Sequence, residues 1–278
     1  MGVEEHVLAK FPAVDHTRKT IYNQRRKELP PLPNNLQSLC IPEDLQVVKF
    51  GEEVLSMVAA DTGPESGDQR ILVFGVKPHL DYLRKCETLI CDGTFDAVPL
   101  LTYQLYTIHG LVGDIAPPLL YALLPNKQTT CYESLFNIVK NVCPELCPTL
   151  ILTDFEKAAF NAFGQAFPLA NLGGCRFHLA QAIMRHVNEH GLKHKYMVDT
   201  EFRIRVKCLQ ALSFIPEPLV VEFFELISAE FEDEELVVLN YFERTYIGAM
   251  NPRSKERRQP QYEIPFWNMQ NRSLLGLP

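Results

Sequence analysis

Residues 88–92, which read TLICD, and residues 150–154, which read LILTD, decide the fold. Each is a short run of apolar or weakly polar residues, typical of a buried strand, that ends in an aspartate. A carboxylate at the end of a buried strand is costly unless it is paired or bound to a metal ion. Asp92 and Asp154 are therefore candidate metal ligands. The plainer interpretation, that each aspartate caps a turn or the following helix, stays open on these residues alone.

The surrounding residues predict three strands followed by two helix–strand crossovers. Residues 103–111 alternate as a half-exposed strand does, and helical spacing begins near Thr130 and again after Asp154. The five expected strands comprise residues 88–92, 103–111, 119–124, 150–153 and 174–177. This order is that of a ribonuclease H-like fold, an α/β fold with a mixed sheet of about five strands and flanking helices. In such a fold the first and fourth strands lie side by side, so Asp92 and Asp154 would face one another.

Beyond the fifth strand the pattern is helical, which predicts an all-helical insertion at that point of the chain. We expect four parts. They are residues 1–44, a basic N-terminal helix and a Pro-rich linker; residues 45–178, the ribonuclease H-like core; residues 179–249, the helical insertion; and residues 250–278, a C-terminal loop.

The charge of the chain is acidic overall but unevenly distributed. The formal net charge is −7, which does not by itself favour nucleic-acid binding. Basic residues nevertheless gather near the two ends of the chain, at Arg25, Arg26 and Lys27 and at Arg257 and Arg258. Two interpretations stay open for them: solvated surface, or local patches that bind DNA phosphates. The acidic run from Glu230 to Glu235 is expected to be solvated surface.

Several classes of protein are disfavoured by the sequence. The longest stretches without charged residues are too polar to span a membrane, and no secretory signal precedes them, so we expect a soluble intracellular protein without membrane partners. The eight cysteines are scattered, which favours buried thiols over disulfides. No P-loop or G-x-S-x-G motif occurs, so we expect no nucleotide cofactor and no serine hydrolase.

Five motifs together resemble the domain of a known family, the Mutator-like element (MULE) transposases. They span about residues 88–178 in the order and approximate spacing of that domain: CDGTF at 91–95, QLYTIHG at 104–110, PLLYALL at 118–124, TDFE at 153–156 and CRFH at 175–178. The resemblance implies a DDE-type enzyme that cleaves and transfers DNA strands with two divalent metal ions, Mg²⁺ or Mn²⁺. It also implies transposon ends and target DNA as partners and a nuclear location. Assembly into a homo-oligomer is compatible with the resemblance.

The resemblance also implies roles for single residues. Asp92 in DGTF matches the first acid, Asp154 in TDFE matches the second, and Cys175 and His178 match the C-x2-H motif of the family. A zinc site that combines this motif with Cys143 and Cys147 is disfavoured. A proline follows each of those two cysteines, and their position at a helix end suggests core packing.

The third acid of the family, a glutamate in a helix after the insertion, has no counterpart that we can assign. Glu222, Glu225 and Glu243 lie in helical patterns, but none has the matching context. The C-terminal loop leads toward the place of that final catalytic helix. The sequence therefore predicts a MULE-type DDE transposase core that is incomplete or inactive as it stands. The alternative is a domesticated, non-catalytic protein that binds DNA or another protein, so whether this chain is an enzyme stays open.

Three further features have two interpretations each. Glu156 could be a further metal ligand, or it could favour the dipole of the helix that follows. Trp267 could stack on a base or anchor the C-terminal segment. The histidines at 186, 190 and 194 could face DNA or form a solvated helix surface.

Overall fold

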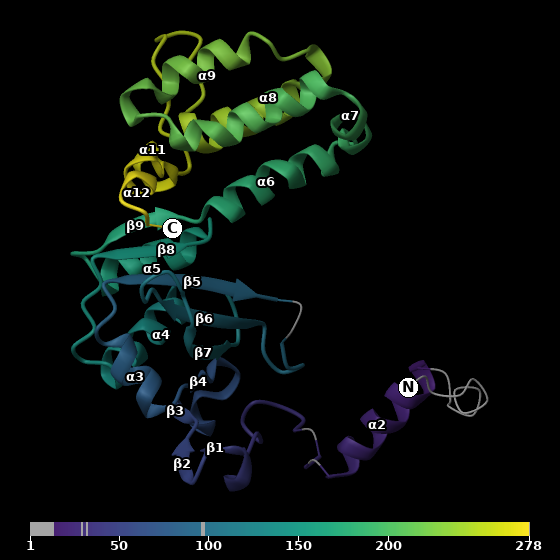
Figure 1. The fold of residues 1–278 in the computed structure, drawn as a ribbon, viewed down its shortest axis with the longest axis vertical. Coiled ribbons are helices and arrows are strands. Elements are labelled where there is room, and N and C mark those ends of the chain that lie inside the picture. Colours follow the sequence, from purple (N-terminus) through teal and green to yellow (C-terminus); the bar gives the residue numbers. More distant parts are fainter. Residues whose placement is uncertain (1–13, 29, 32, 96–97, 278) are drawn as a thin grey trace, which may run out of the picture.

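The computed structural model describes residues 14–28, 30–31, 33–95 and 98–277, and Figure 1 shows a sheet with its helices joined to a mostly helical region. The main sheet has seven strands in the order β3-β4-β7-β6-β5-β8-β9. Their bounds are β3 (Val58–Asp61), β4 (Leu72–Phe74), β5 (Thr88–Thr94), β6 (Gln104–Gly110), β7 (Pro118–Leu124), β8 (Leu150–Thr153) and β9 (Asn171–Gly174). A separate hairpin pairs β1 (Val47–Phe50) with β2 (Glu53–Ser56).

The pairing of the strands confirms the α/β fold expected from the sequence. Strand β5 pairs in parallel with β8, and β8 pairs in parallel with β9, whereas the pairs β5–β6, β6–β7, β7–β4 and β4–β3 are antiparallel. The first and fourth of the five expected strands are therefore neighbours. The sheet is wider than expected because β3 and β4 extend it beyond β7.

Three helices flank the sheet: α3 (Lys77–Leu83), α4 (Thr129–Val142) and α5 (Lys157–Ala166). Apolar residues at helical spacing on α4 and α5 face the strands, as an amphipathic helix requires. The rings of Phe136 on α4 and Phe163 on α5 stack with centroids 4.0 Å apart, and Tyr106 of β6 meets Phe136 edge to face. These contacts form the centre of the first hydrophobic core.

The fifth strand differs from its expected position. Strand β9 ends at Gly174, and Cys175 is already the N-cap residue of α6 (Arg176–Glu189). A Cβ atom at residue 174 would lie 2.7 Å from the ring of Phe155, so the strand passes this ring only because residue 174 is a glycine. The expected strand over 174–177 was wrong, because its last residues form the first turn of a helix.

The N-terminal part contains a helix and a segment that contacts the core. Helix α2 (Val14–Glu28) is present, but the later residues of the expected linker are held against the core. The side chain of Arg70, 4% exposed, donates hydrogen bonds to the carbonyl oxygens of Leu36 and Leu39 and forms an ion pair with Asp61. Residues 36–39 therefore belong to the packed structure.

The helical region has its own hydrophobic core. Its helices are α6, α7 (Lys193–Val198), α8 (Thr200–Ala211), α9 (Val220–Ser228), α10 (Leu236–Phe242), α11 (Ile264–Trp267) and α12 (Gln270–Leu274). Trp267 is completely buried in this core, and its Nε1 donates to the carbonyl oxygen of Tyr246 at 3.1 Å. Trp267 thus anchors the C-terminal segment and is not an exposed stacking residue. The segment expected to be a loop, residues 250–278, contains the two short helices α11 and α12.

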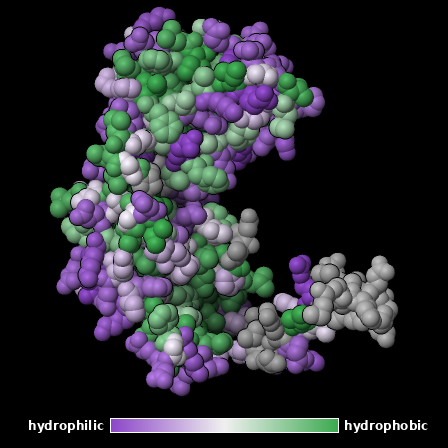
Figure 2. Space-filling view, viewed as in Figure 1, coloured by the Kyte–Doolittle hydropathy of each residue, from purple (hydrophilic) through white to green (hydrophobic). Residues whose placement is uncertain are grey.

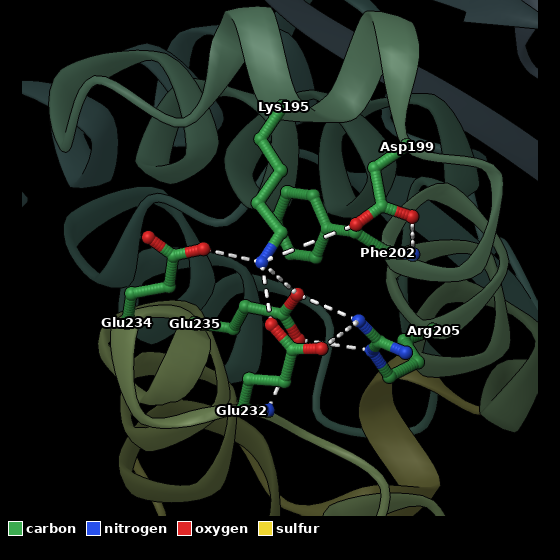
Figure 3. A network of polar contacts seen from close by, with 7 residues as sticks. All are labelled: Lys195, Asp199, Phe202, Arg205, Glu232, Glu234 and Glu235. Atoms are coloured by element: carbon green, nitrogen blue, oxygen red, sulfur yellow. Dashed lines mark hydrogen bonds and ion pairs between the residues drawn. The ribbon is translucent and has the colours of Figure 1, made fainter.

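The acidic run before α10 is exposed at Glu230, Glu232, Asp233 and Glu234, as expected for solvated surface, but Glu235 is buried. The side chain of Glu235 is 0% exposed and receives two hydrogen bonds from Arg205, at 2.7 and 2.9 Å. The ammonium of Lys195 contacts Glu232, Glu234 and Glu235, as Figure 3 shows. Burial alone would raise the pKa of Glu235, but the hydrogen bonds from Arg205 and Lys195 outweigh it and lower the pKa. We call these five residues the Glu235 network, and it joins the start of α10 to α7 and α8.

Candidate active site

Asp92 and Asp154 lie at the same edge of the sheet, on neighbouring strands. The parallel register pairs Thr88 with Leu150 and Ile90 with Leu152. Continued by two residues, this register sets Asp92 level with Asp154, and neighbouring strands are about 4.8 Å apart. The two crossover connections thus bring together two acids that are far apart in the sequence. We call them the aspartate pair.

The aspartate pair is poor in positive charge. Asp92 is 43% exposed, and the Nε2 atom of His178 lies 3.4 Å from its Oδ1. Within the described part of the chain, Asp154 makes no ion pair with a lysine or arginine. Burial raises the pKa of the Asp154 carboxyl, the charge of Asp92 raises it further, and His178 opposes both. A carboxylate whose proton affinity is raised by burial and by a neighbouring carboxylate favours the binding of an added cation.

The first turn of α6 places Cys175 and His178 beside the pair. Interaction with the Cys175 side chain raises the pKa of His178 despite the opposing effect of burial, and both aspartates add to the rise. Burial would raise the pKa of Cys175, but the interaction with His178 outweighs it and the pKa is lowered. Positive charge at His178 is therefore favoured next to Asp92. Of the other two cysteines considered for zinc, Cys143 is buried in the first core and Cys147 is exposed.

The backbone next to Asp154 is held by the helical region. The ring of Phe155 meets the rings of Tyr246, Tyr262 and Phe266 edge to face, with centroids 5.1 to 5.5 Å apart. The hydroxyl of Tyr262 donates to the carbonyl oxygen of Phe155. The second core therefore fixes the residue that follows Asp154, and with it the direction of the Asp154 side chain.

The backbone next to Asp92 is constrained by a buried glutamine. Gln104 is 0% exposed, and its Oε1 accepts a hydrogen bond from the hydroxyl of Tyr132 at 2.8 Å. A Cβ atom at Gly93 would lie 2.0 Å from the Nε2 of Gln104. Glycine after Asp92 therefore allows β5 to pass over this fixed side chain.

Glu156 lies close to the aspartate pair without completing a metal site. It immediately precedes α5, its Oε1 is buried without a hydrogen-bond partner, and its pKa is raised by burial and then by the charge of Asp154. Among the residues that the structure describes, no three His, Cys, Asp or Glu side chains are arranged to hold a metal ion. Both interpretations of Glu156 stay predictions.

The comparisons with known proteins agree with this geometry. Residues 88–182 match the family model described as the MULE transposase domain. These residues belong to the MULE transposase family. The match begins at the first residue of β5 and ends within α6, so it contains the aspartate pair, Cys175 and His178. A comparison with curated proteins found no match.

Strand β5 of the MULE transposase domain points to a hollow side of the molecule. The arrowhead of β5 in Figure 1 points to this side, and Figure 2 shows the surface hollowed there between the helical region and the sheet. Over the described ranges, no helix is long and apolar enough to cross a membrane.

Three residues beside the aspartate pair were missed by the sequence analysis. Phe95 and Tyr103 are 43% and 44% exposed, with ring centroids 5.6 Å apart, and the Nζ of Lys127 lies 6.0 Å from the centre of the Tyr103 ring. The signal that could have found Phe95 is its position directly after the strand that carries Asp92. Tyr103 and Lys127 carry no such signal, because only the sheet brings them to Phe95.

The basic residues expected to bind DNA have unequal surroundings. Arg257 is 17% exposed and pairs with Glu225 and Glu243, which makes it part of the helical region's structure. Arg258 and Lys27 are exposed. Arg25 and Arg26 lie in α2, but their side chains lie outside the described residues.

The histidines on and after α6 are also unequal. His186 stacks on Tyr241 with centroids 3.5 Å apart and is in ring contact with His190, whereas His194 is exposed. Helix α10 therefore covers part of this row of histidines, through Tyr241.

A separate cleft of about 1210 Å³ lies between β9 and the C-terminal segment, lined by residues that include Lys157, Asn171 and Gln261. Neither member of the aspartate pair lines it. The cleft lies where the two hydrophobic cores meet.

Proposed function

We propose that this chain carries a metal-dependent core for DNA strand cleavage and transfer, of the DDE type. The observation that carries the proposal is the aspartate pair: two carboxylates on parallel neighbouring strands, with His178 at 3.4 Å from Asp92 and no lysine or arginine paired with Asp154 in the described residues. Membership of residues 88–182 in a transposase family supports DNA as the substrate.

The donor set fits Mg²⁺ or Mn²⁺. Both are hard cations that prefer oxygen ligands, and Mg²⁺ in particular needs only one or two carboxylates when substrate phosphates supply further ligands. Asp92 and Asp154 would hold the metal. When bound, such ions activate water and neutralise charge on the phosphate. The protein contributes the rest through position: Tyr262 and the rings around Phe155 fix Asp154, and His178 lies against Asp92.

A second candidate function is DNA binding without catalysis. It is favoured by one observation, namely that the described residues offer no third carboxylate arranged with the pair. Both candidates place the protein on DNA, and hence in the nucleus of a nucleated cell, where a homo-oligomer could join two DNA ends.

Manganese binding to the full chain tests the metal site without requiring turnover. Titration of Mn²⁺, followed by the electron paramagnetic resonance of the free ion, should show binding to the unmodified protein. Asp154→Asn should weaken this binding by more than about 100-fold, since loss of even an outer-shell partner costs 10- to 100-fold. Asp81→Asn is the matched control, because Asp81 is 46% exposed and pairs only with Arg84 among the described residues.

Nicking of supercoiled DNA in Mn²⁺ then separates the two candidates. Nicking that is lost in Asp154→Asn and kept in Asp81→Asn supports the catalytic function. Metal binding without nicking supports the non-catalytic one. Equal Mn²⁺ affinity in Asp154→Asn and the unmodified protein contradicts the metal site itself.

A further inference from the structure

Phe95, Tyr103 and Lys127 form a cluster that we call the Tyr103 platform. Phe95 and Tyr103 lie at the two ends of the connection between β5 and β6, and Lys127 follows β7. Antiparallel pairing of Thr94 with Leu105 and of Gln104 with Leu124 brings these two connections to one edge of the sheet. It is the edge that carries Asp92.

The platform exposes its rings rather than burying them. Phe95 and Tyr103 are each more than two-fifths exposed, and their planes meet at 73°. Each ring therefore keeps a large part of its surface in contact with solvent. Exposed apolar surface beside charged groups often marks a binding site.

The positive charge of Lys127, which lies over the Tyr103 ring, indicates which kind of ligand would cover the two rings. Lys127 lies over the Tyr103 ring, close enough to Glu156 for its charge to act on that carboxyl. A purely apolar partner would leave this ammonium unmatched. A nucleotide offers both a flat face for the rings and a negative phosphate for the lysine.

We propose that the Tyr103 platform binds one unpaired nucleotide of the DNA strand next to the bond that is cleaved, with its base stacked on Phe95 and in contact with Tyr103 at its edge, and with its phosphate at Lys127. The proposal rests on the proposed function for its substrate. Phe95 follows Asp92 by three residues of strand, a distance of about 10 Å. The base must be unpaired and unstacked, because in a duplex both of its faces are covered by neighbouring bases.

The binding of single-stranded DNA to the full chain tests the platform in the absence of metal. The probe is a short fluorescein-labelled oligothymidylate, followed by fluorescence anisotropy in EDTA. Phe95→Ala should raise the Kd about 5- to 150-fold, the range expected for loss of one stacked base. Phe95→Trp should keep the affinity. Phe50→Ala is the matched control, since Phe50 is 78% exposed on β1, away from this edge.

A strand of the same length built only of abasic sites isolates the contribution of the base. The unmodified protein should bind it about as weakly as Phe95→Ala binds oligothymidylate, and Phe95→Ala should weaken it no further. Lys127→Gln should weaken both strands and reduce the salt dependence by roughly one phosphate contact.

Two results would overturn the proposal. One is that Phe95→Ala and Tyr103→Ala bind oligothymidylate as the unmodified protein does, which would leave a protein partner as the ligand of the platform. The other is that Phe95→Ala loses equal affinity for the abasic strand. Because these measurements exclude metal, they stand apart from the Mn²⁺ test: the platform can fail while the metal site holds, and the reverse.

Discussion

The Glu235 network and the aspartate pair are both built from acidic side chains, but their surroundings have opposite consequences. In the network, Arg205 and Lys195 meet the glutamates at hydrogen-bond distance. At the pair, the one ion-pair partner among the described residues is a histidine at 3.4 Å. The pKa of Glu235 is accordingly lowered, whereas that of Asp154 is raised.

The difference separates structural acids from functional ones. A buried carboxylate that the protein neutralises itself contributes to the fold and has no charge left for a ligand. Carboxylates that are left close together without such partners destabilise the fold slightly and favour an added cation. The acidic run around Glu235 is the more conspicuous in the sequence, yet the aspartate pair is the better candidate for function.

The largest expected effect is on stability. Glu235→Gln should lower the free energy of unfolding by about 3–5 kcal/mol, because it leaves the buried end of Arg205 without its partner. Urea denaturation followed by circular dichroism measures it. Glu234→Gln, at a 62% exposed position in the same network, should cost no more than about 1 kcal/mol. Equal losses in the two variants would show that burial does not distinguish these acids.

Divalent metal should have the next largest effect, and only through the aspartate pair. At about 100 times its Kd, Mn²⁺ should stabilise the unmodified protein by about 2.7 kcal/mol. Glu235→Gln should gain the same increment from its lower starting point, whereas Asp154→Asn should gain none. Thermal unfolding with and without Mn²⁺ measures all three, and stabilisation of Asp154→Asn would place the metal elsewhere.

A smaller effect is expected where the two regions meet. Tyr262→Phe removes the hydroxyl that donates to the carbonyl of Phe155, which should cost about 1 kcal/mol of stability. It should also weaken Mn²⁺ binding, because Asp154 loses part of its support. Tyr241→Phe is a suitable control, since its hydroxyl contacts Tyr246 and not Phe155. Equal Mn²⁺ affinity in Tyr262→Phe and the unmodified protein would show that the helical region does not position Asp154.

The smallest effect is a change in stability at low pH. The folded-state pKa of Glu235 is lowered from its ordinary value of 4.5, so its contribution to stability is present above that pH and is lost as the pH falls through the folded value. The stability gap between the unmodified protein and Glu235→Gln should therefore narrow below pH 4.5. Denaturation curves at several pH values measure it, and a gap that widens in acid would contradict the ion pairing.

The sheet could be predicted from the sequence because the residue patterns that indicate strands and helices are local. Apolar runs ending in Asp92 and Asp154, and the strand and helix order around them, were enough to place β5 beside β8, and the motifs were enough to indicate the family. The roles of the two acids as metal ligands stay predictions. Strand β9 was expected three residues too late, over 174–177, whereas it spans Asn171–Gly174 and residues 176 and 177 begin a helix.

The other features depend on contacts between residues far apart in the chain. Leu36 and Arg70 are 34 positions apart in the sequence, and Phe155 and Tyr262 are 107 positions apart. No local sequence pattern therefore predicts either contact. The same holds for the burial of Trp267, the pairing of Arg257 and the contact of Tyr103 with Lys127.

The sequence by itself therefore determined which acids directly follow a short apolar run of a strand, because such a run is a local property. Only the tertiary structure decided which acids are neutralised. Neutralisation requires a cation within hydrogen-bond distance, and its position depends on how two separate cores pack around the chain.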